Sequence, residues 1–290
     1  MQIPKLEVIQ HLNEYFSPNI VGNELIKKLL TLQMFANPKY DEALSYLIIG
    51  GSASGKSVMS KFFQGIFADR CGYIQRWATP IGISEMLMFC DSGWCVVDEF
   101  DKFPKQSRNI FLECMSDRTV TAHTHKQHIQ RNARTNIIAL CNPTQPELIE
   151  EIPLTEQLSF SGDFYLLNRF SFIIPVYPPM SGLYPEIAKK YLSKEDLGKY
   201  YSKFREIAIE RRMNIPKVNI DRDLREKVGL YVQLLKDMNP NKQILIGPRL
   251  INGIYAAMQA RSRMSGRGNA KKEDLEYVQK IMKEIGLDGY

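Results

Sequence analysis

One short run in the chain has residue types and spacing suited to holding phosphate. It fits the pattern G-x-x-x-x-G-K-[ST] without a mismatch and reads Gly50, Gly51, Ser52, Ala53, Ser54, Gly55, Lys56 and Ser57. Small residues let backbone N–H groups wrap phosphate oxygens, and a following helix adds the positive end of its dipole. Lys56 would reach the β- and γ-phosphates, and Ser57 would ligate Mg²⁺. A chance Gly/Ser turn is disfavoured by the apolar run before it and the helical pattern after it, so we predict that this run binds ATP–Mg²⁺.

A second feature is an apolar run, residues 94–97, that ends in two carboxylates. At the end of a strand, Asp98 can hold the Mg²⁺ shell while Glu99 polarises the attacking water. Taken alone this signal is weak, because many strands end in acidic turns. Asn142 follows another apolar run and is placed to orient that water. An Asn-Pro turn with Pro143 is the alternative, and both interpretations can hold together.

Alternating elements must position these residues. Apolar runs at 44–49, 94–98, 135–141 and 171–176 predict buried strands, and helices are expected at about 56–67 and 105–116. Buried strands that alternate with helices imply an α/β fold with a mostly parallel sheet covered on both faces. Two further helices are expected within 1–40, and the polar, β-prone stretch 118–133 predicts a hairpin.

After Tyr177-Pro178-Pro179 the pattern becomes purely helical. Helices are predicted at about 185–212, 221–238, 248–264 and 271–286. We therefore predict an α/β domain over 1–177, with the N-terminal helices, and an α-helical lid domain over 178–290, with nucleotide in the cleft between them.

The composition is that of a globular protein, with 44% hydrophobic residues and a net charge of +6 over 290 residues. No apolar run is long enough to span a membrane and the first residues lack a signal-peptide stretch, so we predict a cytoplasmic protein without a membrane partner. The five cysteines show no zinc-ligand spacing. The excess of basic residues lies after residue 178, where it indicates either a nucleic-acid surface or a solvated helical one.

At this point a family resemblance becomes specific. The run from Trp94 to Lys102 looks like the Walker B signature of MCM replicative helicases, in which Asp-Glu-Phe-Asp-Lys is characteristic. Five further stretches follow in the family's order: 17–22, 132–134, 141–143, 166–170 and 248–250. The resemblance implies a P-loop AAA+ fold, a three-layer parallel sheet with a helical lid. It also implies ATP hydrolysis coupled to DNA translocation or unwinding by a homo-hexameric ring, with single-stranded DNA in its channel and other replication proteins as partners.

The resemblance also implies roles for single residues. Asn142 matches sensor 1, Arg169 matches the arginine finger that enters a neighbouring subunit's site, and Arg249 matches sensor 2. Ile20 and Val21 match the stretch that contacts adenine. A guanidinium near the γ-phosphate stabilises the negative charge of the transition state, and surface salt-bridging is the alternative for both arginines.

The predicted hairpin matches the element that grips DNA in this family. Its tip carries the residues we predict to bind DNA: His123, His125, Lys126 and His128. Lys126 could contact phosphate and the histidines could stack on a single strand. A metal site made by the three histidines and a plain exposed hairpin are the alternatives.

The chain departs from the family pattern in several places. Residues 1–40 leave no room for the family's N-terminal domain, 69–93 are too few for its helix-2 insert, and Asp117 stands where the family has a trans-acting Gln. These departures leave hydrolysis intact and argue against processive unwinding. Two other functions therefore stay open: a DNA-remodelling or loader ATPase that uses ATP as a switch, and a nucleotide-binding scaffold that needs a partner subunit.

Overall fold

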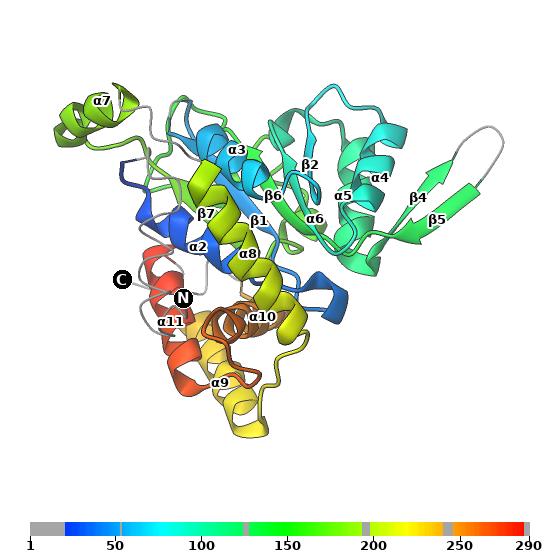
Figure 1. Ribbon diagram of the computed structural model, residues 1–290. Coiled ribbons are helices and arrows are strands. Elements are labelled where there is room, and N and C mark those ends of the chain that lie inside the picture. Colours follow the sequence, from blue (N-terminus) through cyan, green and yellow to red (C-terminus); the bar gives the residue numbers. More distant parts are fainter. Residues whose placement is uncertain (1–20, 53, 124–127, 193–197, 240–245, 287–290) are drawn as a thin grey trace.

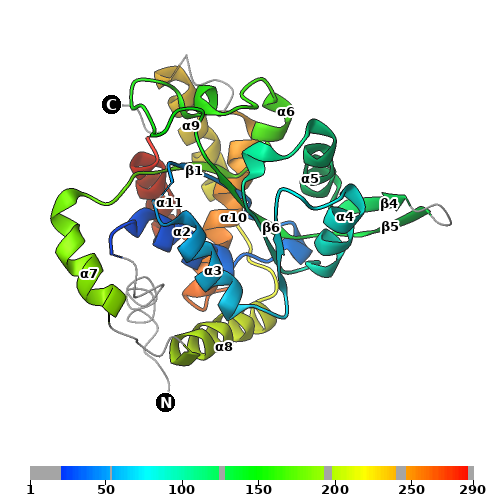
Figure 2. The same ribbon diagram turned by 90° about the horizontal axis from the view of Figure 1, so that it is seen from above.

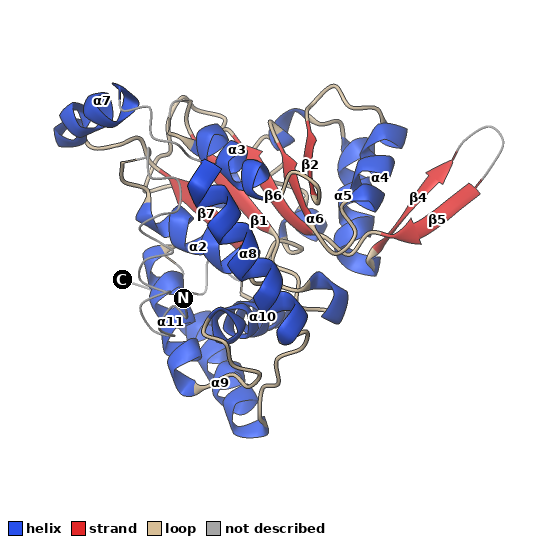
Figure 3. Ribbon diagram, in the orientation of Figure 1, coloured by secondary structure: helices blue, strands red, loops and turns tan. Residues whose placement is uncertain are grey.

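The computed structural model describes residues 21–52, 54–123, 128–192, 198–239 and 246–286. Within them a five-stranded sheet has the strand order β2-β3-β6-β1-β7 (Figure 3), and every neighbouring pair is parallel. The predicted α/β fold with a mostly parallel sheet is confirmed. The strands of this sheet are β1 (Tyr46–Gly50), β2 (Cys71–Ile74), β3 (Trp94–Val97), β6 (Asn136–Cys141) and β7 (Phe172–Val176).

Helices cover both faces of the sheet because its strands are apolar on both sides. Alternate residues of β1 enter different core clusters: Tyr46 and Ile48 join one, and Leu47 and Ile49 join the other. The first cluster includes helices α2 (Glu24–Met34), α3 (Lys56–Ile66) and the C-terminal helices. The second includes α4 (Pro80–Phe89), α5 (Lys105–Asp117) and α6 (Phe164–Leu167). The runs that read as continuously apolar are thus the ones buried on two sides.

Three elements of the sheet region were missing from the predicted set: β2, α4 and the short helix α6. Strand β2 spans only four residues, and α4 follows it directly. A Cβ on Gly72 would lie 2.5 Å from Met86 Sδ and 2.7 Å from Cys90 Sγ, so the close approach of α4 to β2 requires glycine here. A four-residue strand with a central glycine carries too little periodicity to be recognised.

The predicted hairpin is confirmed. Strand β4 (Thr119–His123) pairs antiparallel with β5 (His128–Asn132), from Thr119 opposite Asn132 to His123 opposite His128. Ser84 Oγ of α4 donates to Thr121 O at 3.4 Å and helps to hold the root of the hairpin. The strands project well beyond the helices in two perpendicular views (Figures 1 and 2).

The C-terminal part is helical, as predicted. Its helices are α7 (Tyr184–Leu192), α8 (Gly198–Asn214), α9 (Arg222–Met238), α10 (Pro248–Met264) and α11 (Lys272–Glu284). The single helix expected at 185–212 corresponds to α7 and α8. Short 3₁₀ turns complete the described part at Pro38–Tyr40, Phe100–Lys102, Leu154–Gln157 and Ser181–Leu183. Of the two helices expected within 1–40, the second is α2 and the first lies outside the described residues. In the described ranges no helix combines the length and apolar character that crossing a membrane requires.

A buried arginine joins the C-terminal helices to the sheet region. Arg263 of α10 is fully buried, forms an ion pair with the buried Glu42, and donates to Phe35 O at 2.5 Å and Ile215 O at 2.7 Å. Glu42 also accepts a hydrogen bond from Val218 N at 3.0 Å. Helices α9 to α11 lie together beneath the sheet in Figure 1 and share a core cluster with one of its faces. The domain boundary at 177/178 stays a prediction.

Candidate active site

A cavity of about 440 Å³ lies at the carboxyl ends of β1, β3 and β6. Parallel strands end at the same edge of a sheet, which is where α/β folds place their ligands. The phosphate-binding run, the paired carboxylates and Asn142 therefore meet, although they are distant in sequence. The residues around the cavity are Ser52, Ser54, Gly55, Lys56, Ser57, Val58, Asp98, Glu99, Leu140, Cys141 and Asn142.

Glycine is required at the start and the end of the phosphate-binding loop. A Cβ on Gly50 would lie 2.4 Å from Val176 O, and one on Gly51 would lie 2.7 Å from Pro146 O. Gly55 has φ +86°, a left-handed conformation that favours glycine, directly before α3 begins at Lys56. Ala53 lies outside the described residues. The loop is thus shaped so that α3 points its N-terminus at the cavity, where backbone N–H groups favour anions.

Oxygen atoms of the loop hold the Lys56 side chain at the N-terminus of α3. Its Nζ donates to Gly50 O at 2.5 Å and to Gly51 O at 2.8 Å, and lies 3.5 Å from Asn142 Oδ1. Burial lowers the pKa of Lys56. The ammonium group therefore reaches the other motifs while neutral dipoles, and not carboxylates, satisfy it. A phosphate group can replace those dipoles without breaking an ion pair.

Asp98 is oriented through both of its oxygens. Tyr73 of β2 donates its hydroxyl proton to Asp98 Oδ2 at 2.5 Å, and Glu99 N donates to Asp98 Oδ1 at 3.0 Å. Burial, and then the hydrogen bond to Asp98, raise the pKa of Tyr73 well above its usual value. Tyr73 thus stays protonated and remains a donor at neutral pH. The carboxylate plane is set before any ligand binds.

Glu99 lines the same cavity. Its Oε2 is 3.3 Å from Arg76 Nε, and both side chains are partly exposed. Glu99 has φ +51°, a left-handed conformation that is uncommon outside glycine and that frequently accompanies a functional constraint. The guanidinium of Arg76 in turn lies 6.0 Å from the ring centroid of Trp77. A carboxylate in this position is accessible to water and can act as a general base.

Asn142 is positioned by the turn that follows the paired carboxylates. Its backbone N–H donates to Asp101 Oδ1 at 3.1 Å, and Asp101 is buried. The backbone carbonyl of Asp101 accepts from Ser159 Oγ at 3.1 Å. The Asp-Glu-Phe-Asp run therefore supplies the two carboxylates and also anchors the strand end that carries Asn142.

The donor set fits a magnesium nucleotide. Ser57 and Asp98 both line the cavity, and their hydroxyl and carboxylate oxygens are ligands that Mg²⁺ accepts. These two residues would hold the ion, which would supply positive charge to stabilise the phosphates. Near the P-loop, Val21 is buried and Asn23 Nδ2 donates to Ser54 O at 3.1 Å. Ile20 lies outside the described residues, so an adenine-contacting role for Ile20 and Val21 stays a prediction.

The fold places Arg169 and Arg249 around one cavity, which is separate from the cavity at the P-loop. They line a second cavity of about 650 Å³ beside Ser45 and Ser171, the residues that precede β1 and β7. This is the amino-terminal edge of the sheet. Since a strand rises about 3.3 Å per residue, the two edges are roughly 15 Å apart along β1. The described lining of the P-loop cavity also contains no residue of α7 to α11, which differs from the expected position of nucleotide against a lid.

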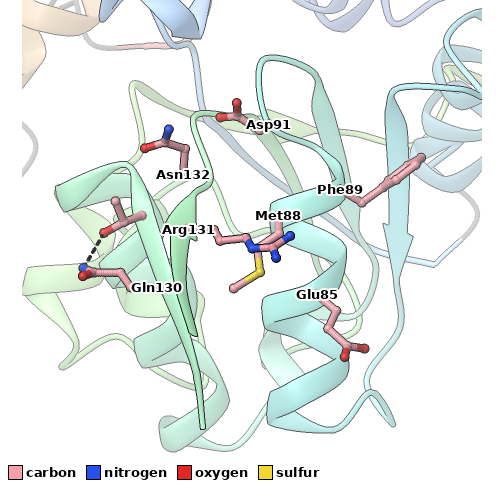
Figure 4. Close-up of a pocket in the computed structure, with 8 residues that line it drawn as sticks. Glu85, Met88, Phe89, Asp91, Gln130, Arg131 and Asn132 are labelled. Carbon is pink, nitrogen blue, oxygen red and sulfur yellow. Dashed lines mark hydrogen bonds between the residues drawn. The ribbon is translucent and has the colours of Figure 1, made fainter. Parts of the chain in front are cut away.

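The root of the hairpin borders a third hollow, which Figure 4 shows in close-up. It measures about 890 Å³ and lies between α4 and the hairpin. Its lining residues are Glu85, Met88, Phe89, Asp91, Thr119, Gln130, Arg131 and Asn132. In Figure 4, Arg131 extends from β5 over Met88. His125 and Lys126 lie outside the described residues, whereas His123 is the last residue of β4 and His128 is the first residue of β5. DNA contact by this tip therefore stays a prediction.

Comparison with known proteins agrees with this arrangement. The family model for the MCM P-loop domain matches residues 77–182, which include the paired carboxylates, the hairpin and Arg169. The chain is 24% identical to DNA replication licensing factor mcm4 of Schizosaccharomyces pombe over 96% of its own length, and 25% identical to the minichromosome maintenance protein MCM of Saccharolobus solfataricus over 94%. The chain carries an AAA+ module of the MCM family.

The MCM-family module spans only part of these relatives. It covers 35% of the Schizosaccharomyces pombe protein, 44% of the Saccharolobus solfataricus protein and 36% of DNA replication licensing factor Mcm2 of Drosophila melanogaster, to which it is 23% identical. The names of the licensing factors connect those proteins with DNA replication.

Sequence reasoning missed three residues beside the candidate site: Asn23, Tyr73 and Arg76. Each acts through another group, namely Ser54, Asp98 and Glu99. Tyr73 and Arg76 belong to β2 and the turn after it. Recognising β2 beside β3 would have placed both near the paired carboxylates, because the two strands are parallel. No local pattern marks Asn23.

Proposed function

We propose that this module binds and hydrolyses ATP–Mg²⁺ and couples hydrolysis to DNA translocation or unwinding in replication, as a hexameric ring. One observation carries the proposal: Lys56, Asp98, Glu99 and Asn142 line a single cavity at the carboxyl edge of a parallel sheet. Phosphoryl transfer depends mainly on positioning and charge, and this set supplies a cation, a metal-holding carboxylate, a base and an amide.

Each residue has a defined task in this proposal. Lys56 exchanges its contacts with the loop carbonyls for the β- and γ-phosphates. Glu99 accepts a hydrogen bond from the attacking water and takes its proton, and Asn142 orients the same water. Asp98, oriented by Tyr73, and Ser57 hold the metal. The alignment of water, base and phosphate lowers the barrier through proximity.

Arg169 and Arg249 act on the nucleotide of a neighbouring copy. Their position at the opposite edge of the sheet supports this part of the proposal, because neither lines the P-loop cavity of its own chain. A contact between two different edges of identical subunits is heterologous, and such contacts close into rings when the rotation allows. Hydrolysis would then require assembly.

The hairpin moves DNA in this proposal. Its projection beyond the helices (Figures 1 and 2) supports contact with a ligand outside the subunit. Lys126 and the histidines at its tip would contact phosphates and bases of a single strand. Among the relatives, the licensing factors are named for DNA replication, and other replication proteins are the expected partners.

ATP hydrolysis measured with and without single-stranded DNA, over a range of protein concentrations, tests the proposal. We expect a rate per subunit that rises with concentration and with DNA. Lys56→Ala should abolish hydrolysis, whereas Lys61→Ala, an exposed lysine on the same helix, should retain it. Equal rates for Lys56→Ala and the unmodified protein would refute the assigned site. Strand displacement on a forked duplex then separates a helicase from a loader ATPase, which would hydrolyse ATP without displacing a strand.

A further inference from the structure

The cavity at the amino-terminal edge of the sheet is strongly cationic. Its lining includes Arg118, Arg169, Lys217, Arg225 and Arg249, and the only carboxylate among its described lining residues is Asp41. Burial lowers the pKa of Arg169, and the neighbouring charges of Arg249 and Arg118 lower it further, while Asp117 opposes them. Like charges in this proximity repel each other, so the cavity is stabilised by an anion.

Among the described residues, three of the four guanidiniums in this cavity have neither an ion pair nor a side-chain hydrogen bond. Among the residues that the structure describes, no carboxylate forms an ion pair with Arg118, Arg169 or Arg249, and Arg169 Nε is buried without a hydrogen bond. Arg225, by contrast, donates from Nε to Ile220 O at 3.0 Å. Arg118 and Arg169 are partly buried and Arg249 is exposed. Cations that share one cavity without carboxylate partners repel one another, so this grouping favours an anionic ligand from outside the chain.

Arg118 has a second unusual property. It ends α5 with φ +60°, a left-handed conformation for which glycine, and sometimes asparagine, is the ordinary choice. Its N–H donates to Cys114 O at 3.1 Å, and its carbonyl accepts from Ala133 N at 2.8 Å. The backbone is thus fixed between α5 and the segment after the hairpin. A long cationic side chain kept at such a position points to a function.

Arg118, and not the preceding Asp117, faces the cavity. Asp117 is exposed and is absent from the described lining, whereas Arg118 is partly buried within it. Burial lowers the pKa of Arg118, and Cys114 and Asp41 partly compensate. The side chain is still a cation at neutral pH, because guanidinium does not deprotonate in this range.

We propose that Arg118 is a third cation of this cavity and contacts the phosphates of the nucleotide bound in the P-loop of an adjacent copy. The inference rests on the proposed function, since it requires that Arg169 acts in trans. A nucleoside triphosphate carries several negative charges, so three guanidiniums match it better than one or two. Arg118 stabilises the charge that develops on the transferred phosphoryl group, and it does so from a backbone position shared with the root of the hairpin.

Mixing two inactive variants tests the inference. Arg118→Ala and Lys56→Ala should each hydrolyse ATP at least about tenfold more slowly than the unmodified protein. A one-to-one mixture, assembled before ATP is added, should regain about a quarter of the normal rate, because each site needs one intact P-loop and one intact arginine from different subunits. If Arg118 acts within its own chain, the mixture stays as slow as its components.

A mixture of Arg169→Ala with Lys56→Ala distinguishes the role of Arg118 from the trans arrangement that the proposed function requires. If Arg169→Ala regains activity with Lys56→Ala but Arg118→Ala does not, the assignment of Arg118 is wrong and the proposed function stands. If neither mixture regains activity, the trans arrangement itself is wrong. Arg222→Ala, which removes an exposed arginine paired with Glu226, is the matched control and should keep the normal rate.

A glycine variant excludes a merely structural role. Arg118→Gly should melt at a higher temperature than Arg118→Ala, since glycine adopts the left-handed conformation without strain. Both variants should be equally impaired in hydrolysis. If Arg118→Gly recovers hydrolysis along with stability, Arg118 serves the fold and the inference is overturned.

Discussion

The charged side chains at the two edges of the central sheet differ in whether they have partners within the chain. At the carboxyl edge, Lys56 is satisfied by loop carbonyls, Asp98 by Tyr73 and Glu99 by Arg76. At the amino edge, Arg169 and Arg249 have no ionic partner among the described residues. The groups of the first edge have partners within the chain, whereas we propose that the second edge is completed by an anion from another molecule.

Burial alone does not explain the difference. Arg263 is more deeply buried than Arg169, yet its guanidinium donates to Glu42, Phe35 O and Ile215 O. Natural proteins pair a buried arginine in this way when the arginine serves the fold. Arg263 is thus paired within the fold, whereas Arg169, for which we propose a role in catalysis, is not.

The largest expected effect concerns the base at the carboxyl edge. Glu99→Gln keeps the shape of the side chain and removes its ability to accept a proton, so kcat should fall about 10²–10⁴-fold. Nucleotide affinity should change little, because Glu99 contacts water and not phosphate. ATP hydrolysis and binding of a fluorescent nucleotide measure the two quantities, with Glu85→Gln, at an exposed residue of α4, as the control. A parallel loss of binding would show that Glu99 shapes the pocket.

The second effect is a loss of stability when the buried ion pair of Arg263 and Glu42 is broken. Glu42→Gln leaves Arg263 buried without a counter-charge and should lower the free energy of unfolding by about 3–5 kcal/mol. Removing the exposed partner in the pair of Lys272 and Glu276, by Glu276→Gln, should cost about 0.5 kcal/mol or less. Urea denaturation measures both. If Arg169→Ala destabilised the fold as much as Glu42→Gln does, the distinction between the two arginines would disappear.

A smaller effect concerns the orientation of Asp98. Tyr73→Phe removes only the hydroxyl that donates to Asp98, so the fold should persist while the carboxylate rotates more freely. A hydrogen bond to a charged group contributes about 1.5–3 kcal/mol. We expect a roughly tenfold increase in the Mg²⁺ concentration that gives half-maximal hydrolysis. Tyr165→Phe, at a highly exposed tyrosine, should leave that concentration unchanged.

The smallest effect is a pH dependence of stability at the root of the hairpin. Asp91 accepts from Arg134 at 2.7 Å and 3.0 Å. Burial raises the pKa of Asp91, but these hydrogen bonds outweigh it and hold the pKa below the usual 3.8. The unfolded chain therefore binds the proton first, and the contribution is present above pH 3.8 and lost as pH falls below it. Asp91→Asn should cost about 1 kcal/mol or less at pH 7 and progressively less at pH 3. An equal cost at both pH values would contradict this ion-pair interpretation.

The site at the carboxyl edge was largely predictable because most of its residues are neighbours in the sequence. The P-loop spans eight consecutive residues, and Asp98 and Glu99 are adjacent, so local pattern sufficed to identify them. The strands behind them are apolar on both faces and were equally visible. Strand β2, with four residues, was not, and with it Tyr73 and Arg76 escaped notice.

What the sequence determined by itself is the set of local elements and the identity of the groups that act on phosphate. The tertiary structure decided which groups share a cavity: it placed Arg249 beside Arg169 and Arg118, and away from Lys56. The reason is physical. Hydrogen-bond patterns and loop shapes arise between residues close along the chain, whereas the edge at which a side chain lies, and whether its charge finds a partner, depends on how distant helices and strands pack.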